Sequence, residues 1–286
     1  MTRFHAAVCA SLMLSLSCAD ANEADARKFM AYCEHELNDT KNYDEAGKIC
    51  KRVREDIKVL LGISPLYLQS IVNEADSKWA LGNYPEAFNL YSEAADVAIK
   101  LGDVNKVREL RIRQAEAELF RGKSFEAEIL LRDALRRLQS SRGSNPLQEA
   151  DLLSRHAEVL VTLGQTKAAM QGYLAAFAKL DADSIKHRPI LLKTQLRYAE
   201  LFERQSRYSG ATASYLKLLQ IASSKPSAPE YMAIAYGRLG WISETLGKPA
   251  DALSYYRRQL EVIEKDPAQV AAVDELRKKI VQLEKS

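Results

Sequence analysis

Residues 75–98 read ADSKWALGNYPEAFNLYSEAADVA. In this stretch a small residue, Ala75, is followed seven positions later by a turn former, Gly82. Five positions after the glycine comes a second small residue, Ala87, and the aromatic Tyr91 follows four positions after that. Apolar residues after the glycine recur at i, i+3 and i+4, which is typical of a helix with one buried face. Because glycine often ends a helix, the stretch predicts two helices joined by a tight turn.

The same series occurs six times along the chain. The small residue of the second helix recurs at gaps of 41, 40, 42, 42 and 41 residues, as Ala46, Ala87, Ala127, Ala169, Ala211 and Ala252. The turn position five residues earlier is held by Lys41, Gly82, Gly122, Gly164, Ser206 and Gly247. The small residue of the first helix is Ala75, Ala115, Ala157, Ala199 and Gly240, with Glu34 in the aberrant first copy. A constant period of this size indicates an array whose repeats bury their cores against one another.

The small–turn–small–aromatic–small series, clearest in Ala75, Gly82, Ala87, Tyr91 and Ala94, resembles the tetratricopeptide repeat family. The usual period of that family is about 34 residues. The longer period resembles the extended-helix variety of kinesin light chains and some bacterial regulators. The resemblance covers residues 24 to 265. It implies an all-α fold, a right-handed α-solenoid of about six helical hairpins.

The N-terminus has the features of a secretory signal peptide over residues 1–21. Arg3 precedes a short apolar run, which ends in the A-x-A site Ala19–Ala21. The run is too short to span a bilayer, and no later stretch approaches about 20 apolar residues. We therefore expect an exported protein, periplasmic or secreted, without a transmembrane segment. Lipid attachment at Cys18 is the less favoured alternative, because Ser15 stands where such signals usually have leucine.

The rest of the chain divides into a solenoid over residues 22–266 and a capping helix over 267–286. The tail lacks a paired helix, and its apolar face is formed by Val270, Val273, Leu276, Ile280 and Leu283. A single helix of this kind suits the open end of a repeat array, which needs a polar outer surface. Homodimerisation through this helix is the alternative interpretation.

Two of the four cysteines, Cys9 and Cys18, lie in the signal segment, which leaves Cys33 and Cys50 in the mature chain. An even number in an oxidising compartment suggests one disulfide, and two buried free thiols are the alternative. In tetratricopeptide repeats the two positions face each other within one hairpin. The resemblance therefore implies a Cys33–Cys50 disulfide that supports the aberrant first repeat.

The resemblance also implies a concave surface lined by the first helices. Two residues before each small position stand Asn73, Arg113, Arg155, Arg197 and Arg238, and one residue after it stand Asp76, Glu116, Glu158, Glu200 and Trp241. In the family such positions hold a bound peptide. Arginine suits carboxylates and carbonyls because its donors lie in a planar fork, and Trp79 and Trp241 would hold apolar side chains. The alternative is that the arginines and acids only pair with each other.

Other classes of function find little support. The 41 bases against 38 acids do not form the basic footprint of a nucleic-acid-binding protein. The histidines and cysteines lack metal-ligand spacing, and no phosphate-binding or nucleophile motif occurs. We therefore expect no catalytic site, no cofactor and no metal. The sequence predicts a scaffold that binds a partner protein or extended peptide in the concave groove. The alternative is a structural subunit of an envelope or secretion complex, bound through its convex face or C-terminal helix.

Overall fold

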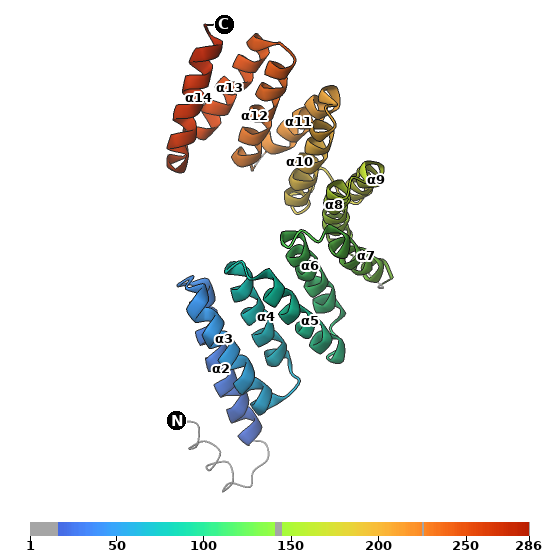
Figure 1. Cartoon of the computed structure of the whole chain (residues 1–286), viewed down its shortest axis with the longest axis vertical. Helices are drawn as coiled ribbons and strands as arrows, with labels where there is room; N and C mark the ends of the chain where they lie inside the picture. The colour runs from blue at the N-terminus through green and yellow to red at the C-terminus, as the bar shows by residue number, and fades with distance from the viewer. Residues whose placement is uncertain (1–16, 141–144, 225, 286) are drawn as a thin grey trace. The chain divides into compact units, whose positions relative to one another are not determined.

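The computed structural model describes residues 17–140, 145–224 and 226–285. Most of the predicted signal peptide, residues 1–16, lies outside them. The described residues form thirteen α-helices and one short 3₁₀ helix and contain no strand, which confirms the all-α solenoid (Figure 1). Nowhere in these three ranges is a helix both long and apolar enough to cross a bilayer. The chain divides into two compact units, Met1–Leu138 and Gln139–Ser286.

Unit 1 is built from three helical hairpins, which follow one another from blue to green in Figure 1. Its helices are α2 (Ser17–Asn38), α3 (Tyr43–Leu61), α4 (Pro65–Ala80), α5 (Tyr84–Lys100), α6 (Val104–Phe120) and α7 (Ser124–Ser140), the last of which ends just beyond the unit. Each helix from α2 to α5 packs on the next one, and α2 also contacts α4. The predicted signal cleavage site falls within the backbone range of α2.

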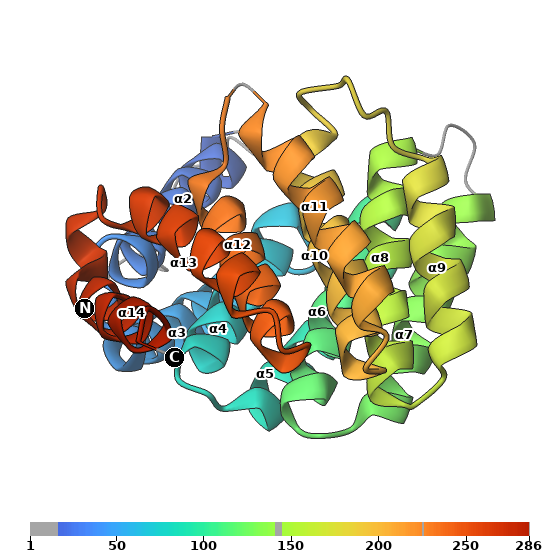
Figure 2. The same cartoon turned by 90° about the horizontal axis from the view of Figure 1, so that it is seen from above.

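Unit 2 contains three more hairpins and a final helix. Its helices are α8 (Pro146–Thr162), α9 (Thr166–Ala178), α10 (Arg188–Arg204), α11 (Tyr208–Ser223), α12 (Pro229–Thr245), α13 (Pro249–Ile263), the 3₁₀ helix η1 (Pro267–Gln269) and α14 (Val270–Leu283). In Figure 2 each first helix, α8, α10 or α12, lies beside its hairpin partner. The first helices also contact each other, α8 with α10 and α10 with α12.

The six predicted turn positions share one backbone conformation. All have a positive φ: 54° at Lys41, 74° at Gly82, 75° at Gly122, 72° at Gly164, 56° at Ser206 and 68° at Gly247. A positive φ reverses the chain after a helix, and glycine adopts it without steric cost. Lys41 and Ser206 have side chains, yet they adopt the same positive φ. The position of the turn within the repeat is therefore kept even where glycine is absent.

The small residues lie where paired helices touch. The six second-helix alanines and the four first-helix alanines are completely buried. The tyrosines four positions after the alanine, Tyr91, Tyr173, Tyr215 and Tyr256, are also buried. In these four hairpins the small residues let the helices approach each other closely around one large buried ring, as the periodic pattern predicts; the first and third hairpins have Cys50 and Leu131 at that position.

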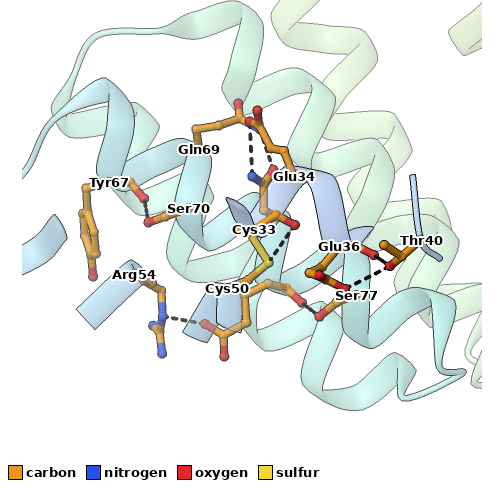
Figure 3. The surroundings of a disulfide bond; sticks show 12 residues. Cys33, Glu34, Glu36, Thr40, Cys50, Arg54, Tyr67, Gln69, Ser70 and Ser77 are labelled. Carbon is orange, nitrogen blue, oxygen red and sulfur yellow. Dashed lines mark hydrogen bonds and ion pairs between the residues drawn. A yellow bond between two sulfur atoms is a disulfide. The ribbon is translucent and has the colours of Figure 1, made fainter. Parts of the chain in front are cut away.

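Cys33 of α2 and Cys50 of α3 form the predicted disulfide, with their Cα atoms 5.0 Å apart (Figure 3). Both cysteines are completely buried in the core of unit 1. The bond links the two helices of the first hairpin. A cross-link of this kind limits the freedom of the unfolded chain.

The final helix α14 covers the end of unit 2. Its buried residues Val273, Leu276 and Ile280 pack with Tyr256 and Ile263 of α13 in one apolar cluster. Lys279 Nζ also forms an ion pair with Glu244 of α12 at 2.7 Å. Most of the predicted apolar face is thus buried within the chain, and Val270 is its exposed member. The structure does not support the alternative of homodimerisation through this helix.

Candidate functional site

The predicted partner-binding residues lie on first helices in both units. Those of unit 1, here called the unit 1 face, are Asn73, Asp76, Trp79, Arg113 and Glu116, on α4 and α6. Those of unit 2, here called the unit 2 face, are Arg155, Glu158, Arg197, Glu200, Arg238 and Trp241, on α8, α10 and α12. Because α10 contacts both α8 and α12, side chains on one side of these three helices are neighbours.

The side chain of Asn73 is buried and hydrogen-bonded within the protein. Its side chain accepts a hydrogen bond from Gln69 Nε2 at 2.8 Å and donates one to Glu34 Oε1 at 3.4 Å. Glu34 directly follows the disulfide-bonded Cys33. Only 4% of Asn73 is exposed. The amide therefore ties α4 to α2, and its polar atoms are already engaged.

Asp76 is bound to the core tyrosine of its own hairpin. The Tyr91 hydroxyl donates to Asp76 Oδ1 at 2.5 Å. Burial raises the pKa of the Asp76 carboxyl, although the hydrogen bond from Tyr91 opposes the shift. Burial also raises the pKa of Tyr91 well above its usual value. The pair joins the first helix to the second and holds a half-buried carboxylate at the edge of the face.

Trp79 belongs to an aromatic cluster at the turn end of the hairpins. Its ring lies edge-on to Tyr84 at 5.2 Å and to Phe120 at 5.1 Å, and the Tyr84 and Phe120 rings stack at 4.7 Å. Phe120 of α6 is 62% exposed, so the cluster is open to solvent on one side. Tyr84 and Phe120 were not among the predicted residues, because they flank turns rather than repeat the spacing of the series.

The arginines of the two faces form ion pairs with acids at different spacings along the chain. Arg113 Nη1 lies 3.8 Å from Glu116, which stands three residues later as the alternative interpretation expects. Arg155 Nε instead binds Asp151 Oδ2, four residues earlier, at 2.8 Å. Arginine–acid pairs therefore occur on both faces, but the spacing between the two residues differs from one pair to the next.

Two further arginines pair between repeats. Arg197 Nη2 of α10 lies 2.5 Å from Glu158 Oε2 of α8. Arg238 Nη1 of α12 lies 3.2 Å from Glu203 Oε1 of α10, and the other oxygen of Glu203 accepts the Tyr215 hydroxyl at 2.7 Å. Ion pairs thus connect α8 with α10 and α10 with α12. Asp151 and Glu203 were not among the predicted residues, although the four-residue spacing of Asp151 and Arg155 in the sequence already favours an ion pair.

Glu200 and Trp241 complete the unit 2 face. Burial raises the pKa of Glu200, and the nearby Arg238 and Arg204 oppose that shift. Trp241 is 38% exposed, and its ring lies edge-on to Tyr208 at 5.9 Å. The unit 2 face therefore carries both a partly exposed indole and charged side chains. Among the described residues, no group of three or more histidine, cysteine or acidic side chains is arranged to hold a metal.

Comparisons with known proteins agree with this architecture. The tetratricopeptide repeat family model matches residues 235–271, which cover most of α12, all of α13 and η1, and the start of α14. No curated protein matches the sequence.

Several solved structures have a similar fold. The crystal structure of BtubC from P. vanneervenii is 16% identical, with 78% of this chain and 92% of that chain covered and a TM-score of 0.66. The apo form of RapI is 15% identical, with 92% and 71% covered and a TM-score of 0.65. The apo form of the quorum sensor NprR from B. thuringiensis is 13% identical, with 88% and 68% covered and a TM-score of 0.65. At these identities the likeness establishes the fold alone.

Proposed function

Because the chain is built from tetratricopeptide repeats, we propose that it is a non-catalytic scaffold that binds a partner peptide or protein on its first-helix faces. The observation that carries this proposal is the recurrence of arginine at one position of four successive repeats, Arg113, Arg155, Arg197 and Arg238. Packing of the core does not require arginine there, since its long side chain loses much freedom when it is ordered.

The geometry of the unit 2 face supports this use of arginine. The guanidinium groups of Arg197 and Arg238 each bind an acid of the neighbouring first helix, so the acid orients a fork that carries five N–H donors in all. Trp241 adds an exposed apolar surface beside them. An extended peptide that offers backbone carbonyls and a small number of carboxylates matches such a surface, whereas a strongly anionic ligand would be repelled by the acids.

We also propose that the protein acts outside the cytoplasm, in the periplasm or as a secreted protein, after cleavage near Ala21. The support is the pattern of residues 1–21 together with a buried disulfide, a bond that persists in oxidising compartments. N-terminal sequencing of the protein purified from its native host tests this location. A mature chain that begins at Asn22 agrees with it, and a chain that retains Met1 contradicts it.

A partner-capture experiment tests the binding proposal. The mature protein serves as bait in the native envelope fraction, beside a variant with Arg155, Arg197 and Arg238 changed to alanine. A matched control carries the same change at Arg257, Arg258 and Arg277, which lie on α13 and α14. Equal melting temperatures of the three baits exclude loss of folding as the explanation.

Three outcomes separate the candidate surfaces. A partner retained by the wild type and the control but lost by the face variant supports the first-helix scaffold. A partner retained equally by all three overturns that assignment. A partner lost only by the variant at Arg257, Arg258 and Arg277 would favour the alternative of a structural subunit bound through its convex face or C-terminal helix.

A further inference from the structure

Exposed aliphatic side chains gather at the end of unit 1 where its hairpins are joined to one another. Two connections lie there, one between α3 and α4 and one between α5 and α6. Their exposed aliphatic residues, here called the apolar tips, are Val59, Leu60, Ile63, Ile99 and Val104. Val59 is 87% exposed, and Ile63 and Val104 are 52% and 57% exposed. Single apolar residues scattered over a surface need no explanation, whereas a group of them marks a contact surface.

The repeat register places the two connections side by side. Ile63 and Val104 are 41 residues apart, which equals the repeat period between the first two hairpins. Arg54 of α3 also pairs with Glu93 of α5 at 2.9 Å, so the second helices that lead to the two connections are neighbours. The apolar tips therefore form one surface rather than two separate spots.

Both connections are tight turns with engaged polar groups. Gly62 and Gly102 have φ values of 59° and 72°, and each donates a backbone hydrogen bond to the helix that ends there. The side chains of Ser64 and Asp103 accept from the backbone of the helices that begin there, at 3.2 and 2.9 Å. Because these groups already have partners, the tips can leave water with little loss of hydrogen bonding. The turns also hold the side chains in place, so binding costs little ordering of the chain.

Lysines stand at the border of the apolar tips. Lys58 adjoins Val59 and Lys100 adjoins Ile99, and both lysines are exposed. A lysine side chain lays its stem along apolar surface and keeps its ammonium group in a polar layer. The acid closest to the tips, Asp103, caps α6. The other acids near this end lie about one helical turn away along α3, α5 and α6 and are Glu55, Asp56, Asp96 and Glu109.

The course of the chain before α2 indicates what the apolar tips contact. Helices α2 and α3 form an antiparallel hairpin joined by residues 39–42, so the start of α2 lies at the same end of unit 1 as the apolar tips (Figure 1). The sequence before α2 contains the apolar run of the predicted signal peptide, which is the segment that enters the membrane during export. Export therefore brings this end of unit 1, rather than the opposite end, against the lipid.

Resting on the export proposed above but not on the first-helix faces, we propose that the apolar tips form a membrane-contact surface. The aliphatic side chains enter the boundary between lipid headgroups and acyl chains, and the bordering lysines remain at the phosphate groups. Because the tips lie on turns at the ends of helices, they meet a flat surface before the sides of the helices do. A few aliphatic side chains give weak and reversible attachment, as one myristoyl chain does.

Vesicle binding of the mature protein tests this proposal. Co-sedimentation with unilamellar vesicles of equimolar phosphatidylcholine and phosphatidylglycerol measures the partition coefficient. The test variant carries Val59→Ser, Ile63→Ser and Val104→Ser. The matched control carries the same change at three exposed apolar residues near the opposite end of unit 1, Leu81→Ser, Phe125→Ser and Ile129→Ser. Serine changes no charge, so long-range attraction to the lipid is the same in all three proteins.

The expected result is that the wild type and the control bind vesicles and that the test variant binds at least about tenfold more weakly. The reason is that three apolar side chains no longer leave water on binding. Equal melting temperatures show that all three proteins are folded. Val59→Ser alone should already weaken binding severalfold, and at 87% exposure this change leaves the core intact.

The opposite results overturn the proposal. They are absence of vesicle binding by the wild type, or equal binding by the wild type and the test variant. A protein partner that is captured by the wild type and lost by the test variant, without vesicle binding, would instead make the apolar tips a protein-docking surface. N-terminal sequencing decides export separately, since a chain that begins at Asn22 but binds no vesicle keeps the proposed location and rejects the membrane contact.

Discussion

The ring of Tyr256 occupies the space that a side chain at Gly240 would need. A Cβ atom built on Gly240 would lie 2.5 Å from Cε1 and 2.8 Å from Cδ1 of that ring. The other described repeats with an aromatic residue at this point have alanine at the first-helix position, as in the pairs Ala75 with Tyr91 and Ala199 with Tyr215. In the last hairpin the tyrosine therefore lies closer to the first helix, and glycine accommodates it.

We expect Gly240→Ala to lower the free energy of unfolding by about 1–3 kcal/mol, because overpacking forces the ring or the helices to shift. Gly237→Ala on the same helix is the control. A Cβ there would meet only the end of the flexible Gln259 side chain, so the gain in helix propensity, at most about 1 kcal/mol, is not offset. Urea unfolding measures both variants. Equal stabilities would contradict the close approach of Tyr256.

The disulfide should contribute mainly to the stability of unit 1. Replacing both Cys33 and Cys50 by alanine is expected to lower the free energy of unfolding by about 3 kcal/mol, since the cross-link limits the unfolded chain. Adding a reductant should destabilise the wild type and leave the double variant unaffected. Alkylation of both cysteines of the mature protein under denaturing conditions without a reductant, seen as an increase in mass, would show that the bond does not form.

Glu203 joins two interactions that a double-mutant cycle can separate. Its carboxylate accepts the Tyr215 hydroxyl and pairs with Arg238 of the next repeat. Tyr215→Phe should cost about 1 kcal/mol, because a buried hydrogen bond to a charged acceptor is lost. With Arg238→Ala added, a coupling energy above about 0.5 kcal/mol is expected, since the two partners share one carboxylate. Strict additivity in thermal unfolding would argue against that network.

The stability effect of Glu200 should depend on pH. Burial raises the pKa of its carboxyl above the unfolded value of 4.5, so the folded state binds the proton more tightly than the unfolded state. The resulting stabilisation is complete below the unfolded pKa and is lost as the pH rises through the folded pKa. Glu200→Gln removes this loss, so its melting temperature relative to wild type should be higher at pH 7 than at pH 4. A difference independent of pH would contradict the raised pKa.

Much of the fold follows from local signals that recur in the sequence. The turn positions from Lys41 to Gly247 were predicted from spacing alone, and all six have a positive φ. The disulfide partners were predicted through the resemblance, because the register places Cys33 and Cys50 opposite each other. A single chain provides such signals because each hairpin is built from residues near in sequence and the pattern recurs in every repeat. Ser206, which stands where most repeats have glycine, is therefore identified as a turn position by its spacing from the turns of the other repeats.

The ionic contacts of the candidate faces were not predictable to the same degree. Arg155 has Asp151 one turn before it and Glu158 three residues after it, and both spacings allow an ion pair on a helix. The structure assigns Arg155 to Asp151 because Glu158 is bound by Arg197 of the next repeat. That choice depends on how closely α8 and α10 approach, which no spacing within one helix encodes.

The sequence by itself thus determined the helices, the turns, the small residues at their contacts and the period of the array, because these depend on the backbone and on residues near in the chain. Tertiary structure alone decided which acids Arg155 and Arg197 bind and that Asn73 is buried. These outcomes arise from competition between side chains on neighbouring repeats, where differences of a few tenths of an ångström in helix packing determine which charges meet.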